Sequence, residues 1–319
     1  MTLTLLTLTM AYWPPLVALL LATVVALLRH RRATPLTLPA SVRRWLVTGV
    51  GSALALLLLL PVLSLPGVIP HLPRSFLADW HGLTLTGLAA PLVAGIVATA
   101  LLALPMPERD GSGTADLSRR TAFGFVARPW ALALAASAAA ALGLAIAAGM
   151  ASTLDDQGRR TMYVVDVGTT AVGSTIYGWF FSVPCLVLLA VLLATSAATT
   201  VLISRPPWDR DRKVDTSIRR RRTRDVLTVA VGALLLHLSG VLRFLANTAA
   251  LEGGMTAGDG TWFWAITPFS ALETALRFLG NATDVAGWLL WLLVLLATLA
   301  GSARHRTTAE RAAWTDASH

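Results

Sequence analysis

Long apolar stretches alternate with shorter polar connections along this chain. Each of seven stretches holds roughly 20 mostly apolar residues, the length that a helix needs to cross the hydrocarbon core of a bilayer. We place these spans at residues 12–29, 45–64, 83–104, 130–150, 175–203, 226–248 and 284–302. The pattern predicts an all-α polytopic membrane protein, a single bundle of seven transmembrane helices in residues 1–303, with a short cytoplasmic tail at 304–319.

Basic residues indicate how these helices are threaded. Of the 26 Lys and Arg residues, only Arg74, Arg159, Arg160 and Arg277 lie in the second, fourth and sixth connections, and Arg243 lies inside a span. Because Lys and Arg near span ends tend to stay in the cytoplasm, we predict an N-terminus outside and a C-terminus inside. The residues before the first span lack a basic segment, which favours a retained first helix over a removed signal peptide.

Composition favours lipid as the environment of these helices. The chain is 55% hydrophobic and 13% charged, whereas soluble domains carry about 25% charged residues. The formal net charge of +9 lies next to spans, so we expect anionic lipid headgroups as partners and no nucleic acid. The strong excess of Arg over Lys is typical of GC-rich bacterial coding, and we therefore assign the protein to a bacterial cytoplasmic membrane.

The connection before the seventh span carries signals of an additional helix. Ser270 and Glu273 form a capping-box pattern, and Gly280 suits a helix end. Glu273 and Arg277 have the i, i+4 spacing of a helical ion pair. We predict a short amphipathic helix within residues 262–280 that lies in the outer interface. A re-entrant segment lining a cavity is the alternative.

Polar residues in the sixth span are the first site candidates. Ionisable groups within a span are costly and usually face the protein interior. Ser239, Arg243 and Asn247 recur at i, i+4 and i+8 and form one polar stripe, whereas His237 lies on a different face. These four residues are our cavity or binding candidates. Alternatively, Arg243 reaches the outer interface or pairs with an outer acid, and His237 is a buried histidine with a hydrogen-bond partner.

The connections on the predicted outer side hold a second group of candidates. They are His71, His81, Asp155, Asp156 and Asp166. Histidine and carboxylate side chains bind divalent metals, but these residues lack the paired helical spacing of a metal motif. We therefore expect no bound metal and no cofactor.

The basic run before the sixth span has a simpler interpretation. Arg219, Arg220, Arg221 and Arg222 are predicted to face lipid headgroups and to fix the orientation of the chain. The same segment could contact a protein partner in the membrane. Similar Pro-Leu-Val-Ala sequences in the first and third spans have two interpretations: chance within alanine- and leucine-rich spans, or repeated helical hairpins.

No motif in the chain identifies a reaction or a cargo. Our leading hypothesis is a transport-related protein, either a small permease or the membrane subunit or accessory of a transporter. The first alternative is a membrane enzyme that acts at the outer face on a lipid-linked or envelope substrate. The second is a non-catalytic sensor or assembly factor. The sequence favours a protein without catalytic activity over an enzyme.

Overall fold

Helices make up most of the protein. The computed structural model describes residues 2–30, 38–63, 80–104, 124–167, 170–204, 211–256, 260 and 262–317. Its α-helices are α1 (Thr2–His30), α2 (Ala40–Leu63), α4 (Trp80–Leu101), α5 (Arg128–Met150), α6 (Trp179–Ser204), α7 (Arg212–Ala249) and α8 (Glu273–Ala317).

Six of these helices are long and apolar enough to cross a membrane, and α1 adds a shorter apolar stretch, Tyr12–Leu28. The prediction of a multi-pass helical membrane protein is confirmed at this level. Three helices are clearly longer than predicted, and α1 begins at Thr2 rather than near Tyr12. Helix α7 begins at Arg212 rather than Val226, and α8 begins at Glu273 rather than Asp284.

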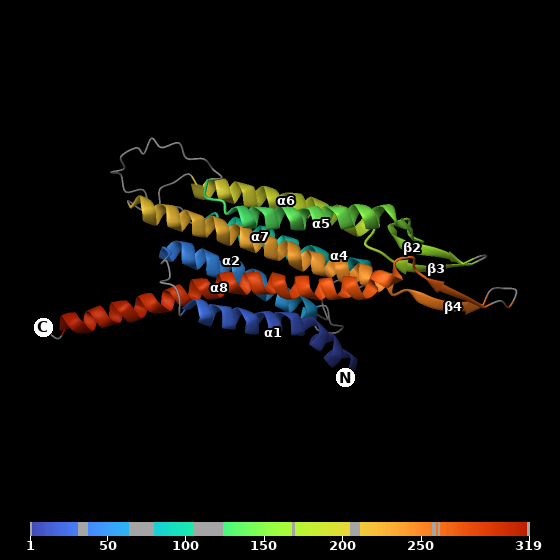
Figure 1. Cartoon of the computed structure of the whole chain (residues 1–319), viewed down its shortest axis with the longest axis horizontal. Coiled ribbons are helices and arrows are strands. Elements are labelled where there is room, and N and C mark those ends of the chain that lie inside the picture. The colour runs from blue at the N-terminus through green and yellow to red at the C-terminus, as the bar shows by residue number, and fades with distance from the viewer. Residues whose placement is uncertain are drawn as a thin grey trace.

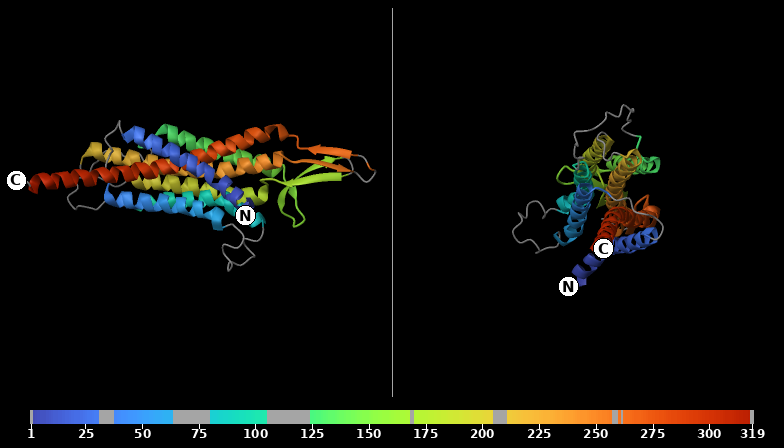
Figure 2. Two further views of the ribbon diagram at one scale, coloured as in Figure 1. Left: turned by 90° about the horizontal axis from the view of Figure 1, so that it is seen from below. Right: turned by 90° about the vertical axis from the view of Figure 1, so that its left-hand side faces the viewer.

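The helices run side by side along one axis, and successive helices point in opposite directions (Figure 1). Helix α7 is central: it packs against α4, α5, α6 and α8, while α1 lies at the periphery against α8. The most apolar window of α7 is 78% buried, against 22–39% for the other five long helices. Figure 2 shows the bundle from below and along its axis.

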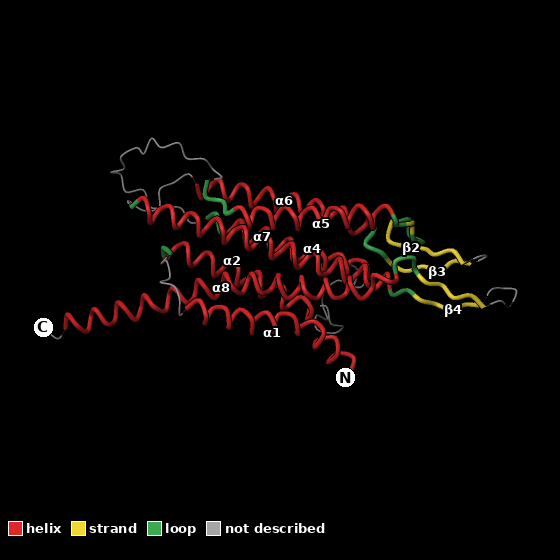
Figure 3. Tube along the Cα trace, in the orientation of Figure 1, coloured by secondary structure: helices red, strands yellow, loops and turns green. Residues whose placement is uncertain are grey.

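Strands extend the bundle at one end, which we call the hairpin end (Figure 3). Strands β1 (Thr153–Leu154), β2 (Arg160–Val167) and β3 (Thr170–Thr175) form an antiparallel sheet in that order. Strands β4 (Glu252–Thr256) and β5 (Trp262–Ile266) form an antiparallel hairpin between α7 and α8. The opposite end, where α7 begins, is the arginine end.

The prediction of a separate interfacial helix within residues 262–280 is wrong. Its first part is strand β5, and a 3-10 turn, η1 (Ser270–Leu272), leads directly into α8. Helix α8 does not end at Gly280. A Cβ atom on this glycine would lie 2.9 Å from Cγ of Arg243, so glycine here permits close packing of α8 on α7. The predicted ion pair between Glu273 and Arg277 is present at 2.9 Å.

Small residues allow the central helix to approach its neighbours. A Cβ atom on Gly95 of α4 would lie 2.4 Å from Cβ of Ala233 of α7. Gly232 of α7 faces the indole of Trp291, and Gly287 of α8 faces Leu236. Lipid tails are as apolar as leucine, so helix association in a membrane depends on such close packing and on polar contacts.

Candidate functional site

An ion pair joins the two most closely packed helices of the bundle. Nη2 of Arg243 on α7 lies 2.7 Å from Oδ2 of Asp284 on α8. The Asp284 side chain is 8% exposed and the Arg243 side chain 36% exposed. Arg243 also donates to the Ser239 hydroxyl over 3.3 Å, and Trp288 donates to the Asp284 carboxylate. Because an unpaired carboxylate at this depth would be costly, Arg243 makes the burial of Asp284 tolerable.

The spacing of residues along α7 and α8 places the side chains of this site on the two faces that meet. Gly280, Asp284 and Trp288 recur at i, i+4 and i+8 and so share the face of α8 that meets α7. Ser239 and Arg243 share the facing stripe of α7. Two residues of the predicted stripe, Ser239 and Arg243, are therefore in contact. The third, Asn247, is exposed at the hairpin end.

His237 lies on another face of α7, in agreement with its helical position. Its Nδ1 atom lies 2.9 Å from the carbonyl oxygen of Leu88 on α4, and the residue is 3% exposed. Since a carbonyl oxygen only accepts hydrogen bonds, Nδ1 is assigned as the protonated nitrogen. His237 thus links α7 to α4, and it takes no part in the hydrogen bonds and ion pair of Arg243 and Asp284.

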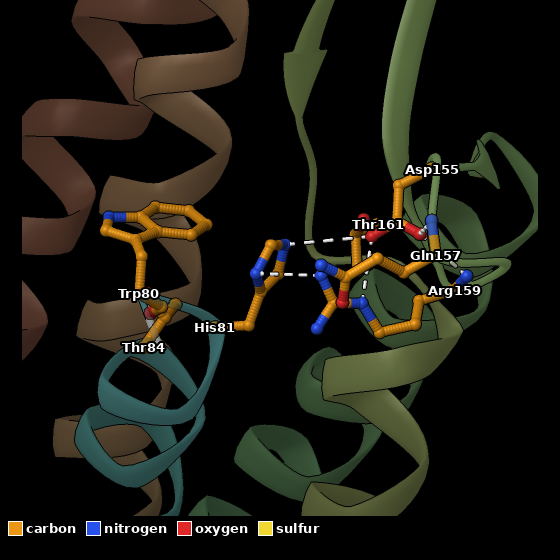
Figure 4. Close-up of polar contacts among 7 residues, drawn as sticks. All are labelled: Trp80, His81, Thr84, Asp155, Gln157, Arg159 and Thr161. Carbon is orange, nitrogen blue, oxygen red and sulfur yellow. Dashed lines mark hydrogen bonds and ion pairs between the residues drawn. The ribbon is translucent and has the colours of Figure 1, made fainter. Parts of the chain in front are cut away.

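A second polar cluster lies at the hairpin end, where α4 meets the turn between β1 and β2 (Figure 4). Nδ1 of His81, on α4, lies 3.1 Å from Nη2 of Arg159, and Nε2 lies 3.9 Å from Oδ2 of Asp155. The His81 ring stacks on Phe181 at 6.0 Å between centroids, and the Arg159 guanidinium lies 5.3 Å from the Phe180 ring centre.

Asp155 is the centre of this cluster. Its carboxylate accepts hydrogen bonds from the backbone N–H groups of Gln157 and Arg159, from Nε of Arg159 and from the Thr161 hydroxyl, all within 2.9 Å. Burial by itself raises the pKa of Asp155, but these hydrogen bonds outweigh it and hold the pKa well below its usual range. With its oxygens occupied in this way, Asp155 organises the β1–β2 turn and is poorly placed to act as a base.

The other outer-face candidates do not join this cluster. Asp156 and Asp166 are exposed, and His71 lies outside the described residues. In the described ranges, no group of three or more His, Cys, Asp or Glu side chains is arranged to hold a metal ion. Of the described residues in this set, the structure therefore brings together only His81 and Asp155. Arg159 contacts both of them and so joins α4 to the turn between β1 and β2.

The basic run on α7 differs from the expectation that all four arginines face lipid. Arg219 and Arg222 are 1% and 3% exposed. Nη1 of Arg219 donates to the carbonyl of Ser204 at the end of α6 over 2.6 Å, and Nη2 of Arg222 donates to the carbonyl of Leu102 beyond α4 over 2.8 Å. Cations stabilise helix C-termini, where carbonyls lack intrahelical partners and the helix dipole is negative.

Sequence reasoning missed Asp284 as a site residue. It is the first residue of the predicted seventh span, a position where a charged side chain ordinarily marks the end of a span. Its spacing from Gly280 and Trp288 was the available signal. The early start of α7 also had a signal, since Asp211 caps the helix by accepting from the backbone N–H of Lys213 over 2.8 Å.

Fold and site define a multi-pass membrane protein with an ion pair between two of its apolar helices. No protein-family model, curated protein or solved structure matches the chain. The functional argument therefore depends on the geometry of the Arg243–Asp284 pair and its surroundings.

Proposed function

We propose that this chain is a seven-helix protein of a bacterial cytoplasmic membrane, with α1 as the seventh span and the arginine end in the cytoplasm. The alternating directions of the helices support this arrangement, because they bring Arg43, Arg44, Arg128 and the basic run of α7 to one end. Positive charge near span ends favours the cytoplasmic side. From Trp130 to Met150, α5 covers about 30 Å, which matches the hydrocarbon core.

We further propose a transport-related function, with the Arg243–Asp284 pair as the site that recognises the solute. The observation that carries this proposal is an ion pair between two apolar helices whose basic partner remains 36% exposed. Charged side chains in membrane segments are expensive and frequently serve substrate or ion pathways. A solute with a carboxylate or phosphate group can compete with Asp284 for the guanidinium of Arg243. Ser239 and Trp288 add a hydroxyl and an indole N–H next to it.

Flux measurements in proteoliposomes test this function. Radiolabelled acetate, succinate, glutamate and phosphate are offered to vesicles containing the native protein, Arg243→Gln or Asp284→Asn. We expect accumulation of at least one of these anions by the native protein and at least a tenfold loss in Arg243→Gln. The amount of folded protein in each vesicle preparation is measured in parallel.

Arg277→Gln is the matched control. Arg277 lies near the hairpin end in an exposed pair with Glu273, so its substitution removes the same charge without touching the α7–α8 contact. Flux in this variant should equal that of the native protein. Equal flux in Arg243→Gln and native vesicles removes the pair from the mechanism, and no accumulation of any of the four anions by native protein contradicts the transport proposal.

A further inference from the structure

The first turns of α7 present two chemically different faces. Lys213, Ser217, Arg220 and Arg224 are spaced by four, three and four residues, so they lie along one side of the helix. Lys213 and Arg220 are exposed, and the Arg224 side chain is 49% exposed. We call Lys213, Arg220 and Arg224 the cationic stripe.

The opposite side of the same turns faces the protein. There Asp215 pairs with Arg219 at 2.9 Å, and Arg219 and Arg222 hold helix carbonyls. Arg221 lies between the two sides and donates to the carbonyl of Ala297 on α8 over 3.2 Å. These arginines are occupied by structural contacts, so they are not available to a ligand outside the bundle.

Of the three residues of the cationic stripe, Arg224 has an acidic side chain near it, and that partner is shared with Arg221. Asp215 is engaged by Arg219. Asp225 is 7% exposed at its side chain, with Nε of Arg221 at 3.7 Å and Nε of Arg224 at 3.9 Å. Among the residues that the structure describes, no ion pair involves the side chains of Lys213 or Arg220. The outward face of α7 therefore carries concentrated positive charge.

The stripe lies beside the start of the apolar part of α7. Arg224 lies two residues before Val226, which begins the almost continuously buried apolar part of the helix. Arg220 lies about 6 Å further out along the axis, so both residues lie just beyond the apolar segment, where a helix that spans a bilayer meets the headgroups. Lys213 lies about 16 Å from Arg224 along the helix, on the aqueous side.

From these observations we propose that Arg220 and Arg224 bind the phosphate of an anionic phospholipid at the arginine end, with Lys213 attracting it electrostatically. Two guanidinium groups at i, i+4 spacing reach one phosphate from adjacent turns, and arginine donors match phosphate geometry. The site is distinct from Arg219 and Arg222, which cap helices. It goes beyond the transport proposal and does not depend on it, although both assume that the bundle spans a membrane.

Lipid titration of the purified full chain tests the proposal. Native mass spectrometry of the protein in neutral detergent measures binding of phosphatidylglycerol, with phosphatidylcholine as the uncharged comparison. We expect preferential retention of phosphatidylglycerol by the native chain. Each arginine near a membrane surface contributes roughly a fivefold gain in affinity, so the double variant R220Q/R224Q should bind this lipid at least tenfold more weakly.

Two matched variants separate lipid binding from folding. R160Q/R277Q removes the same charge from exposed positions at the hairpin end and should keep native affinity for phosphatidylglycerol. R222Q removes a helix cap and should lower the melting temperature while lipid affinity is retained. Equal loss of lipid in R160Q/R277Q and R220Q/R224Q, or native affinity in R220Q/R224Q, overturns the proposal.

Competition with inorganic phosphate shows whether the stripe binds the phosphate of a lipid or free phosphate in solution. Millimolar phosphate should leave the bound phosphatidylglycerol in place, because the acyl chains of the lipid add apolar contacts with the bundle. If inorganic phosphate displaces it fully, the stripe is a site for soluble phosphate and the assignment to lipid is wrong. The flux assay of R220Q/R224Q is expected to remain native, so failure of either proposal is recognised separately.

Discussion

Arg243 and Asp284 are bound to each other across the α7–α8 contact at 2.7 Å, but they are buried unequally. The Asp284 side chain is 8% exposed and the Arg243 side chain 36% exposed. Asp284 is therefore more deeply buried in the protein than its partner. The buried charge of Asp284 therefore needs Arg243 more than the charge of Arg243 needs Asp284.

This asymmetry predicts that Arg243→Gln is more destabilising than Asp284→Asn. Removing Arg243 leaves a buried carboxylate without its counter-ion, a change that typically costs about 3–5 kcal/mol. Removing Asp284 leaves a cation that still reaches polar surroundings, and we expect a cost of about 1–2 kcal/mol. Equilibrium unfolding of both variants in mixed micelles measures the difference. Equal losses would show that the two charges are equally dependent on the pair.

Close packing of α7 on α8 gives a second prediction. A Cβ atom on Gly287 would lie 2.7 Å from Cγ of Leu236 and 2.9 Å from the carbonyl oxygen of Gly232. Gly287→Ala should therefore destabilise the protein by about 1–3 kcal/mol, the usual cost of overpacking. The measurement is the free energy of unfolding in the same micelles.

Gly143 on α5 is the control for that substitution. Apart from its chain neighbours and the backbone of its own helix, no described heavy atom lies within 4 Å of a Cβ built at this position. Gly143→Ala should be neutral or should stabilise the helix by up to about 1 kcal/mol, because alanine has the higher helix propensity. A similar loss in both variants would mean that the effect comes from the backbone and not from the α7–α8 contact.

The long helices were predictable because their signal is local. A run of apolar residues such as Ala131 to Ala148 must be helical in lipid, where every backbone group needs a partner within the segment. The strands gave a weaker signal. Trp262, Phe263 and Trp264 lie in β5, and their strand conformation depends on pairing with β4. Gly254 of β4 accommodates the Trp262 ring. Pairing partners distant in sequence are not specified by local composition.

The candidate site was only partly predictable for a similar reason. Helical spacing identified Ser239 and Arg243 as neighbours, because both lie on one helix. The partner of Arg243 lies on another helix, and the choice between Asp284 and the loop acids depends on how α7 and α8 dock. The split of the basic run has the same origin: Arg219 and Arg222 differ from Arg220 only in which helix ends lie opposite them.

The hydrogen bonds to Asp155 predict a pH-dependent contribution to stability. Its pKa is lowered in the folded protein, so the stabilising contribution is fully present above the unfolded-state pKa of about 3.9 and is lost as pH falls through the lower folded value. The stability difference between native protein and Asp155→Asn should therefore be constant from pH 7 to about pH 5 and shrink below pH 4. A stability difference that stays unchanged from pH 7 down to about pH 2 would contradict this prediction.

The proposed orientation predicts opposite chemical accessibility at the two ends of the bundle. The single native cysteine, Cys185, is 1% exposed and should react little with aqueous reagents. Asp156→Cys and Lys213→Cys each place a thiol at an exposed position, at the hairpin end and the arginine end respectively. A membrane-impermeant maleimide added to spheroplasts should label Asp156→Cys at once and Lys213→Cys only after permeabilisation, because arginine-rich span ends stay in the cytoplasm. Labelling of Lys213→Cys in sealed spheroplasts, with Asp156→Cys protected, would reverse the orientation and place the phospholipid site in the outer leaflet.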